Sequence, residues 1–182
     1  LYSLFTKTTD MKSNPSRYSN ALHGKVIATL FYEPSTRTRL SFESAIQRLG
    51  ASLISTENAR EASSSIKGES LTDTIRIVES YVDAIVMRHQ ENDAADRASK
   101  IAAVPIVNAG GGSGEHPTQS LLDCYTIYER RPSLDNLSVA VIGDLRYGRT
   151  VHSLVKMLSL FDGLTVYGVS LPGLELHEDY IR

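Results

Sequence analysis

The densest group of side chains suited to chemistry lies at residues 33–39 (EPSTRTR), directly after an apolar run and directly before an amphipathic stretch. A turn between a strand and a helix N-terminus favours an anion, because unpaired backbone N–H groups and the helix dipole both point to it. The hydroxyl and guanidinium donors that suit a phosphate or a carboxylate here are Ser35, Thr36, Arg37, Thr38 and Arg39. The alternative is that Ser35 or Thr36 only caps the helix while the arginines are solvated. Two hydroxyl–arginine repeats at one helix start favour the oxyanion site.

A second group, His116-Pro117-Thr118-Gln119, follows a glycine-rich turn and opens another helix. His116 and Gln119 lie three residues apart, so they can share one face of the first helical turn and hydrogen-bond a carbonyl and an amino group. The alternative is that His116 is only a helix-start residue and Gln119 a member of a capping box. Arg88 is expected at the C-terminal end of a strand, where an arginine is often only a solvated surface residue. Because loops beyond the C-termini of parallel strands meet at one edge of a sheet, we expect these loops to converge with the first.

The remaining candidates carry weaker signals. Residues 143–149 (GDLRYGR) follow a strand-like run and open a helix, as nucleotide-binding turns do. They have neither the G-x-G-x-x-G spacing nor the G-K-[ST] ending, so nucleotide binding is disfavoured, but Arg149 could clamp a carboxylate. His89 and His152 have no metal-ligand partner at a useful spacing, so no metal and no cofactor are expected. Cys124 lies among the apolar residues of a helix and is expected in the core.

Alternating strand-like and helical patterns must position these groups. Short apolar runs predict strands at residues 26–32, 53–55, 84–87, 104–107, 138–142 and 164–170. Amphipathic stretches between them predict helices, as where one apolar stripe runs along residues 42–49 and ends at Gly50. The polar residues 56–69 have no periodicity and predict a loop. Strands separated by helices at this spacing predict an α/β fold, with a parallel sheet flanked by helices.

A domain boundary is predicted at residues 130–136 (RRPSLDN), which are polar and contain Pro132. Residues 1–136 would form a first α/β domain, and residues 137–182 the beginning of a second. This second segment contains only two strand-like runs, which cannot make a domain with its own core. The second domain is therefore expected to be incomplete in this chain.

Composition and charge exclude several classes of protein. The chain has 182 residues, and its formal net charge of -2 is not that of a general polyanion binder, so no nucleic-acid partner is expected. Its single cysteine cannot form an internal disulfide, which fits a reducing compartment. No apolar run approaches the roughly 20 residues that a bilayer crossing needs. Because no signal-peptide pattern opens the chain, a cytoplasmic protein without membrane contact is expected.

Two of the motifs resemble signatures of one family. Residues 31–39 (FYEPSTRTR) resemble the carbamoyl-phosphate signature of the aspartate and ornithine carbamoyltransferases, and residues 116–119 (HPTQ) resemble their second signature. Three further segments resemble the aspartate branch of this family: Lys67-Gly68-Glu69, residues 86–89 (VMRH) and residues 143–154 (GDLRYGRTVHSL). Ornithine enzymes usually lack a lysine at the loop position and have a different turn after the first strand of the second domain. The resemblance extends from about residue 26 to residue 169.

The resemblance implies a carbamoyl-phosphate-binding domain followed by an aspartate-binding domain, and it implies a role for each matching residue. Phosphate would be held by Ser35, Thr36, Arg37 and Thr38. The carbamoyl carbonyl would be polarised by Thr38, Arg88 and His116, with Gln119 at its amino end. A carboxylate of aspartate would be held by Arg149, and Ser63 and Lys67 would reach into the site of a neighbouring subunit, because family members form homotrimers with shared active sites.

The activity that the resemblance implies is transfer of the carbamoyl group from carbamoyl phosphate to the α-amine of L-aspartate, a step of pyrimidine biosynthesis. The products would be N-carbamoyl-L-aspartate and phosphate. Two alternatives stay open: ornithine carbamoylation, which Lys67 and the turn before Arg149 disfavour, and a non-catalytic phosphate-binding fragment. Regulatory subunits or fused pathway enzymes are possible partners. Because the family's second domain is considerably longer, this chain alone is expected to be an incomplete enzyme.

Overall fold

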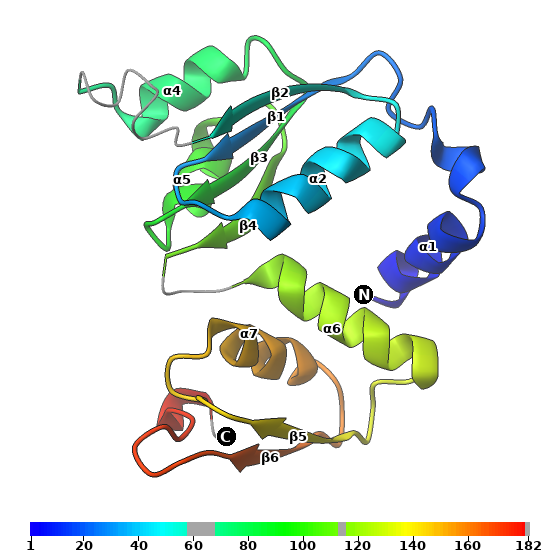
Figure 1. Ribbon diagram of the computed structural model, residues 1–182, viewed down its shortest axis with the longest axis vertical. Helices are drawn as coiled ribbons and strands as arrows, with labels where there is room; N and C mark the ends of the chain where they lie inside the picture. Colours follow the sequence, from blue (N-terminus) through cyan, green and yellow to red (C-terminus); the bar gives the residue numbers. More distant parts are fainter. Residues whose placement is uncertain (58–67, 113–115, 181–182) are drawn as a thin grey trace. The chain divides into compact units, whose positions relative to one another are not determined.

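The computed structural model describes residues 1–57, 68–112 and 116–180 (Figure 1). The chain divides into two compact units, Leu1–Gly112 and Ser113–Arg182. The first contains a four-stranded sheet and the second a two-stranded sheet. All strand pairs in both sheets are parallel, so the predicted α/β class is confirmed.

The first unit alternates strands and helices along the chain. Its helices are α1 (Tyr2–Ser13), the 3-10 helix η1 (Pro15–Tyr18), α2 (Thr36–Arg48), α4 (Leu71–Val78) and α5 (Ala94–Ile101). Its strands are β1 (Val26–Phe31), β2 (Ser52–Glu57), β3 (Ala84–His89) and β4 (Ile106–Gly111), in the order β2-β1-β3-β4. The sequence did not predict α1, whose Phe5 is buried. The strand predicted at residues 104–107 begins two residues too early and ends four residues too early, because β4 begins after Pro105 and continues to Gly111.

Side chains of the first sheet alternate between two apolar layers, as the strand period of two requires. One layer contains Ala28, Leu30, Tyr32, Ile85 and Met87 with residues of α4 and α5. The opposite layer contains Ile27, Phe31, Val86 and Ala109 with Ile46 of α2. Figure 1 accordingly shows α2 in front of the strands and α5 behind them. By the same alternation, the buried polar residues Thr29 and Arg88 lie on the α2 side.

The order of the strands creates a switch point at β1. From β1 the chain continues to β2 on one side and later to β3 on the other. Phe31 pairs in register with Arg88, and the N–H of Tyr32 donates to the Arg88 carbonyl at 2.8 Å. The loops that follow β1 and β3 therefore leave the sheet side by side. In open α/β sheets such a point, at the carboxyl ends of the strands, is where ligands bind.

The C-terminal end of α2 is the predicted one. Gly50 has a φ of +83°, and its N–H donates to the Gln47 carbonyl at 3.1 Å. An added Cβ at Gly50 would lie 2.5 Å from the backbone oxygen of Ser19. Glycine is needed here both for the left-handed conformation and for the close approach of the neighbouring backbone.

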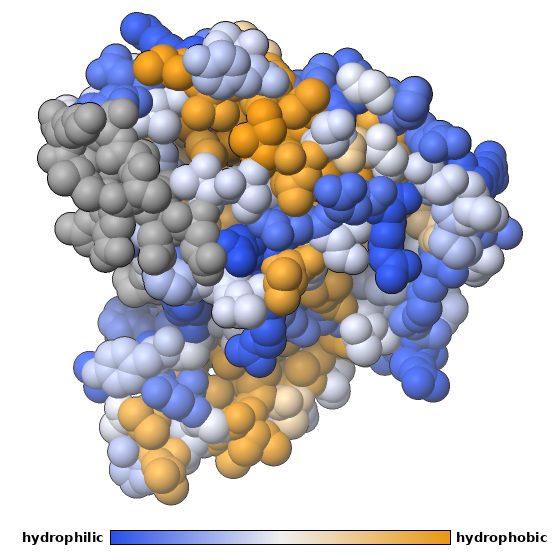
Figure 2. All heavy atoms as spheres, turned by 45° about the horizontal axis from the view of Figure 1, so that its top comes forward, coloured by the Kyte–Doolittle hydropathy of each residue, from blue (hydrophilic) through white to orange (hydrophobic). Residues whose placement is uncertain are grey.

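The second unit is a smaller α/β arrangement. Its elements are α6 (Pro117–Arg130), β5 (Ser138–Ile142), α7 (Arg149–Leu158), β6 (Thr165–Val169) and the 3-10 helix η3 (Glu178–Tyr180). Several large apolar side chains are exposed, among them Ile142, Tyr167 and Leu171, and apolar surface of this unit is visible in Figure 2. Because α6 packs against α7, the compact units divide before the boundary predicted at residue 136. The assignment of residues 1–136 and 137–182 to two domains stays a prediction.

Among the helices of the described ranges, none combines the length and the apolar character that crossing a bilayer would take.

Candidate functional site

The turn between β1 and α2 presents hydrogen-bond donors at a helix N-terminus. Ser35 is the N-cap residue of α2, and its hydroxyl makes no capping hydrogen bond within the described part of the chain. The first turn of α2 contains no acidic residue, so nothing on the helix itself offsets the positive end of its dipole. The structure thus shows no capping hydrogen bond from the Ser35 hydroxyl, and the binding of an anion by this turn stays a prediction.

The two arginines of this turn differ in their surroundings. Arg37 is exposed, and no ion pair of its side chain is seen among the residues that the structure describes. Arg39 is only 20% exposed, and its Nε lies 3.7 Å from Oε1 of Glu43, one helical turn further on. Arg37 is thus the better placed of the two to bind an anion from solvent, whereas Arg39 is engaged on the sheet side of α2.

Arg88 is a buried cation at the C-terminal end of β3, not the solvated surface residue of the alternative. Its side chain is 5% exposed. One terminal nitrogen donates to Oε1 of Glu33 at 2.8 Å, and the other donates to the carbonyl of Ala109 at 3.3 Å. Arg88 thereby ties the loop after β1 to the end of β4.

One donor of Arg88 remains without an acceptor. Its Nε is buried and has no hydrogen-bond partner in the described residues. Buried N–H groups in folded proteins are nearly always paired, so an unpaired donor at the carboxyl end of a strand indicates a place for a ligand acceptor. The sequence analysis missed Glu33 as the partner that holds this guanidinium. Only the register of β1 against β3 brings these two residues together.

The glycines at the C-terminal end of β4 lie against the loop after β3. The N–H of Gly112 donates to the carbonyl of His89 at 2.9 Å. A Cβ on Gly112 would lie 2.2 Å from the backbone oxygen of Gln90, and its φ of +45° also disfavours other residues. The sequence predicted a flexible turn here. For Gly111 and Gly112 the structure instead shows glycine used for close contact between two loops.

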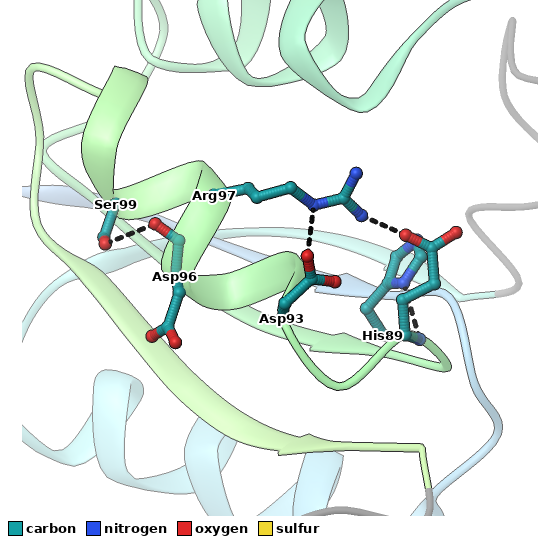
Figure 3. A network of polar contacts seen from close by, with 6 residues as sticks. His89, Asp93, Asp96, Arg97 and Ser99 are labelled. Atoms are coloured by element: carbon teal, nitrogen blue, oxygen red, sulfur yellow. Dashed lines mark hydrogen bonds and ion pairs between the residues drawn. The ribbon is translucent and has the colours of Figure 1, made fainter.

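A network of polar contacts orders the loop between β3 and α5 (Figure 3). Arg97 forms ion pairs with Glu91 and with Asp93, the latter at 3.3 Å. The N–H of Glu91 donates to Nδ1 of His89 at 3.0 Å, so this ring nitrogen carries no proton in that contact. Ser99 donates to the carbonyl of Asp96. The Ser99 bond lies within α5, whereas the contacts of Glu91 and Asp93 hold the loop that continues from Arg88.

In the second unit, His116 and Gln119 lie at the start of α6, as predicted. The N–H of His116 donates to Oγ of Ser153 at 2.7 Å, and the amide nitrogen of Gln119 donates to Asp123 at 2.9 Å. The capping-box alternative is wrong, because a side chain of α7 and not Gln119 accepts the N–H of His116. The proximity of these residues to the loops of the first unit stays a prediction.

Arg149 is the first residue of α7. The turn before it is held by Asp144, whose Oδ1 accepts from the N–H groups of Arg146 and Tyr147 at 3.1 and 2.9 Å. A Cβ at Gly148 would lie 2.4 Å from the Asp144 carbonyl, so this turn also requires glycine. The GDLRYGR motif is therefore a rigid turn that presents Arg149 at a helix N-terminus.

The other predicted residues have three different outcomes. Ser63 and Lys67 lie outside the described residues. Cys124 is fully buried, as expected, and burial raises the pKa of its thiol to about 11. His152 binds the Leu145 carbonyl and stacks on Tyr180, which is a packing role. A hollow of about 660 Å³ between α7, β6 and η3 is lined by none of the predicted site residues.

Comparison with known proteins identifies the family. The family model "Aspartate/ornithine carbamoyltransferase, carbamoyl-P binding domain" matches residues 1–129. The chain therefore belongs to the aspartate/ornithine carbamoyltransferase family. It is 56% identical over 164 residues to the chloroplastic aspartate carbamoyltransferase of Arabidopsis thaliana, covering 90% of this chain and 42% of that protein. It is 53% identical over 169 residues to the catalytic subunit of aspartate carbamoyltransferase from Methanocaldococcus jannaschii, covering 93% and 55% of the two chains.

Solved structures agree with this assignment. The aspartate transcarbamoylase of Trypanosoma cruzi in complex with carbamoyl phosphate is similar with a TM-score of 0.89 at 43% identity, covering all of this chain and 56% of that one. The M. jannaschii catalytic subunit has a TM-score of 0.88 at 50% identity, covering 97% and 57%. The chain thus spans about half the length of the relatives that it matches.

Proposed function

We propose that the protein to which this chain belongs transfers the carbamoyl group of carbamoyl phosphate to the α-amine of L-aspartate, giving N-carbamoyl-L-aspartate and phosphate. The similar T. cruzi enzyme is described in complex with carbamoyl phosphate, and also with carbamoyl aspartate and phosphate. The observation that carries the proposal in this chain is the buried Arg88. Its guanidinium is held by Glu33 beside the donor-rich N-terminus of α2 and keeps one unpaired N–H.

The phosphate subsite is proposed at the start of α2. The hydroxyls of Ser35, Thr36 and Thr38 and the guanidinium of Arg37 would donate to phosphate oxygens, together with the first backbone N–H groups of the helix. Arg37 supplies a planar pair of donors that matches two oxygens of one phosphate. The absence of an acidic residue from the first turn of α2 supports this assignment.

The carbonyl subsite is proposed beyond the ends of the neighbouring strands. Thr38, Arg88 and His116 would donate to the carbamoyl oxygen, and Gln119 would accept from the carbamoyl amino group. When the amine nitrogen attacks the carbonyl carbon, negative charge develops on that oxygen. Each donor aimed at such an oxyanion typically contributes about 10²–10³ in rate. The burial of Arg88 strengthens this effect, because water screens its charge less.

The chemical step then needs no covalent intermediate. The aspartate nitrogen forms a bond to the carbonyl carbon and loses a proton, while the bond from that carbon to the phosphate oxygen breaks and phosphate leaves with the electron pair. Arg149 would hold a carboxylate of aspartate so that the amine faces the carbonyl. Because only the neutral amine attacks, the rate should rise with pH until the amine is deprotonated.

The assembly and the setting belong to the same proposal. A homotrimer would allow Ser63 and Lys67 of one subunit to complete the site of its neighbour. The reaction would serve pyrimidine biosynthesis in the cytoplasm, and regulatory subunits or fused enzymes would be its partners. The resemblance of the motifs to the family supports the trimer and the pathway.

The test measures carbamoyl transfer by the purified protein, with aspartate and ornithine as parallel acceptors and the intact mass recorded alongside. Product with aspartate alone is expected, and Arg37→Ala should abolish most of it. Arg48→Ala is the matched control, since this exposed arginine lies at the other end of the same helix. Turnover of ornithine would contradict the choice of acceptor. Binding of carbamoyl phosphate without turnover by a full-length trimer would favour the non-catalytic alternative.

A further inference from the structure

Glu43 joins α2 to two strands through one carboxylate oxygen. Its Oε1 accepts from Oγ1 of Thr29 on β1 at 3.1 Å and from Oγ of Ser55 on β2 at 2.5 Å. The same oxygen lies 3.7 Å from Nε of Arg39. Glu43 is 17% exposed and Thr29 is completely buried. A single side chain therefore bonds the helix to the sheet below it and to its own preceding turn.

An apolar side chain would have been the simpler choice at this position. Glu43 lies on the face of α2 that also buries Ile46, against the layer formed by Ile27 and Phe31. Placing a carboxylate there has a desolvation cost, which is recovered only when hydrogen bonds of good geometry replace those to water. The polar contacts of Glu43 define the position and rotation of the helix on the sheet. Apolar packing tolerates small rotations and shifts of a helix, whereas hydrogen bonds to two strands allow one position.

The position that Glu43 fixes is that of the first turn of α2. α2 begins at Thr36, so Arg39 lies in its first turn, next to Thr38. Arg39 forms an ion pair with Glu43. Arg39 is 20% exposed, and its ion pair with Glu43 lies on the side of α2 that faces Thr29 and Ser55. The opposite side of the same turn presents Arg37 to solvent.

We infer that Glu43 is a positioning residue for the proposed phosphate-binding turn: its hydrogen bonds to Thr29 and Ser55 and its ion pair with Arg39 set the height and rotation of the α2 N-terminus over the ends of the strands. This inference rests on the proposed function, since it requires that the turn binds the phosphate of the substrate. Glu43 itself touches no substrate.

Removal of the Glu43 charge tests the inference, because electrostatics alone and positioning predict opposite signs. A negative charge close to an anion site repels the anion, so by Coulomb's law alone Glu43→Gln should tighten phosphate binding. Positioning predicts weaker binding, because the first turn of α2 is no longer held in place by the hydrogen bonds to β1 and β2. We expect the dissociation constant of inorganic phosphate, measured by titration, to rise about threefold in Glu43→Gln and about tenfold in Glu43→Met, which loses all three contacts.

Two further variants separate positioning from stability. Thr29→Val removes one donor at nearly constant volume and should weaken phosphate binding in the wild-type background. In the Glu43→Met background it should have no additional effect, because both changes act through the same contact. Asp96→Asn, the same change of charge at an exposed position of α5, should leave phosphate binding unchanged. All variants are compared under conditions in which circular dichroism shows them folded.

Each outcome supports or overturns the inference. Phosphate binding that equals or exceeds that of wild type in both Glu43 variants would overturn it, and a loss of stability alone would then make Glu43 a purely structural residue. Additive effects of Thr29→Val and Glu43→Met would also contradict it. If the wild-type protein itself binds no phosphate, the proposed phosphate subsite fails and this inference fails with it.

Discussion

Replacing Glu33 by alanine leaves the guanidinium of Arg88 in place without its carboxylate partner. Arg88 is 5% exposed and Glu33 is 26% exposed, so the pair is buried at the arginine and partly exposed at the glutamate. Exposed ion pairs contribute about 0–1 kcal/mol, and breaking a fully buried pair by removing one partner costs about 3–5 kcal/mol. Because Glu33 is partly exposed, the cost of removing it should be lower than that for a fully buried pair. Glu33→Ala should therefore destabilise the protein by about 2 kcal/mol.

Urea unfolding followed by circular dichroism measures this effect. With a slope of about 2 kcal/mol per molar urea, the midpoint should fall by about 1 M. Arg88→Met should cost less, because Glu33 can then bind water. The double variant should lie within about 1 kcal/mol of wild type, since no unpaired charge remains buried.

The reasoning is refuted if Glu33→Ala lowers the midpoint by less than about 0.3 M urea. The pair would then behave as an exposed ion pair, in spite of the burial of Arg88. A suitable reference is the pair Lys25–Asp83 at the opposite end of the sheet, whose side chains are 55% and 40% exposed. Its disruption should move the midpoint less than that of the Arg88 pair.

Three more predictions concern the glycine loop, the pH dependence of stability and the cysteine. Gly112→Ala should destabilise the protein by more than about 2 kcal/mol, because φ is positive and the new Cβ would overlap a backbone oxygen. Gly24 also has a positive φ but open space around it, so Gly24→Ala should cost about 1 kcal/mol in the same urea assay. The hydrogen bond from Lys25 holds the pKa of Asp83 below its ordinary value, so its stabilisation is present above that value and is lost as the pH falls through the lowered pKa. Asp83→Asn should therefore lower the melting temperature at neutral pH and not in strong acid; equal differences at both would contradict this. Burial raises the pKa of Cys124 to about 11, so its thiol should resist a thiol reagent at neutral pH in the native protein and react completely in urea. Rapid labelling of the native protein would count against the burial of Cys124.

The strands and the position of the turn before α2 were predictable because their signals are local. The apolar run at residues 26–32 became β1, and the hydroxyl–arginine repeat opened α2 as its sequence indicated. The helix α1 escaped prediction because it buries only Phe5 and so lacks an apolar stripe. The predicted strand at residues 104–107 was displaced because the glycines after Asn108 were assigned to a turn, whereas two of them continue β4.

The partners of the arginines were less accessible from the sequence. Glu33 and Arg88 are far apart in the chain, and only the pairing of β1 with β3 brings them together. Arg37 and Arg39 look equivalent in the repeat, and their difference depends on which side of α2 faces the sheet. A local signal did exist, because Arg39 and Glu43 have the four-residue spacing of a helical ion pair.

The burial of Arg88 in the layer beneath α2 has a consequence for how this sequence can change. Replacing a buried ion pair by apolar residues of similar volume is often neutral or stabilising. Selection for thermal stability alone would therefore accept Met at position 88 together with an apolar residue at position 33, while selection for the proposed carbamoyl transfer would reject both. In libraries of this chain that are sorted only for folded protein, the Glu33–Arg88 pair should be lost over successive rounds. The rate of that loss would indicate how much the pair lowers the stability of the protein.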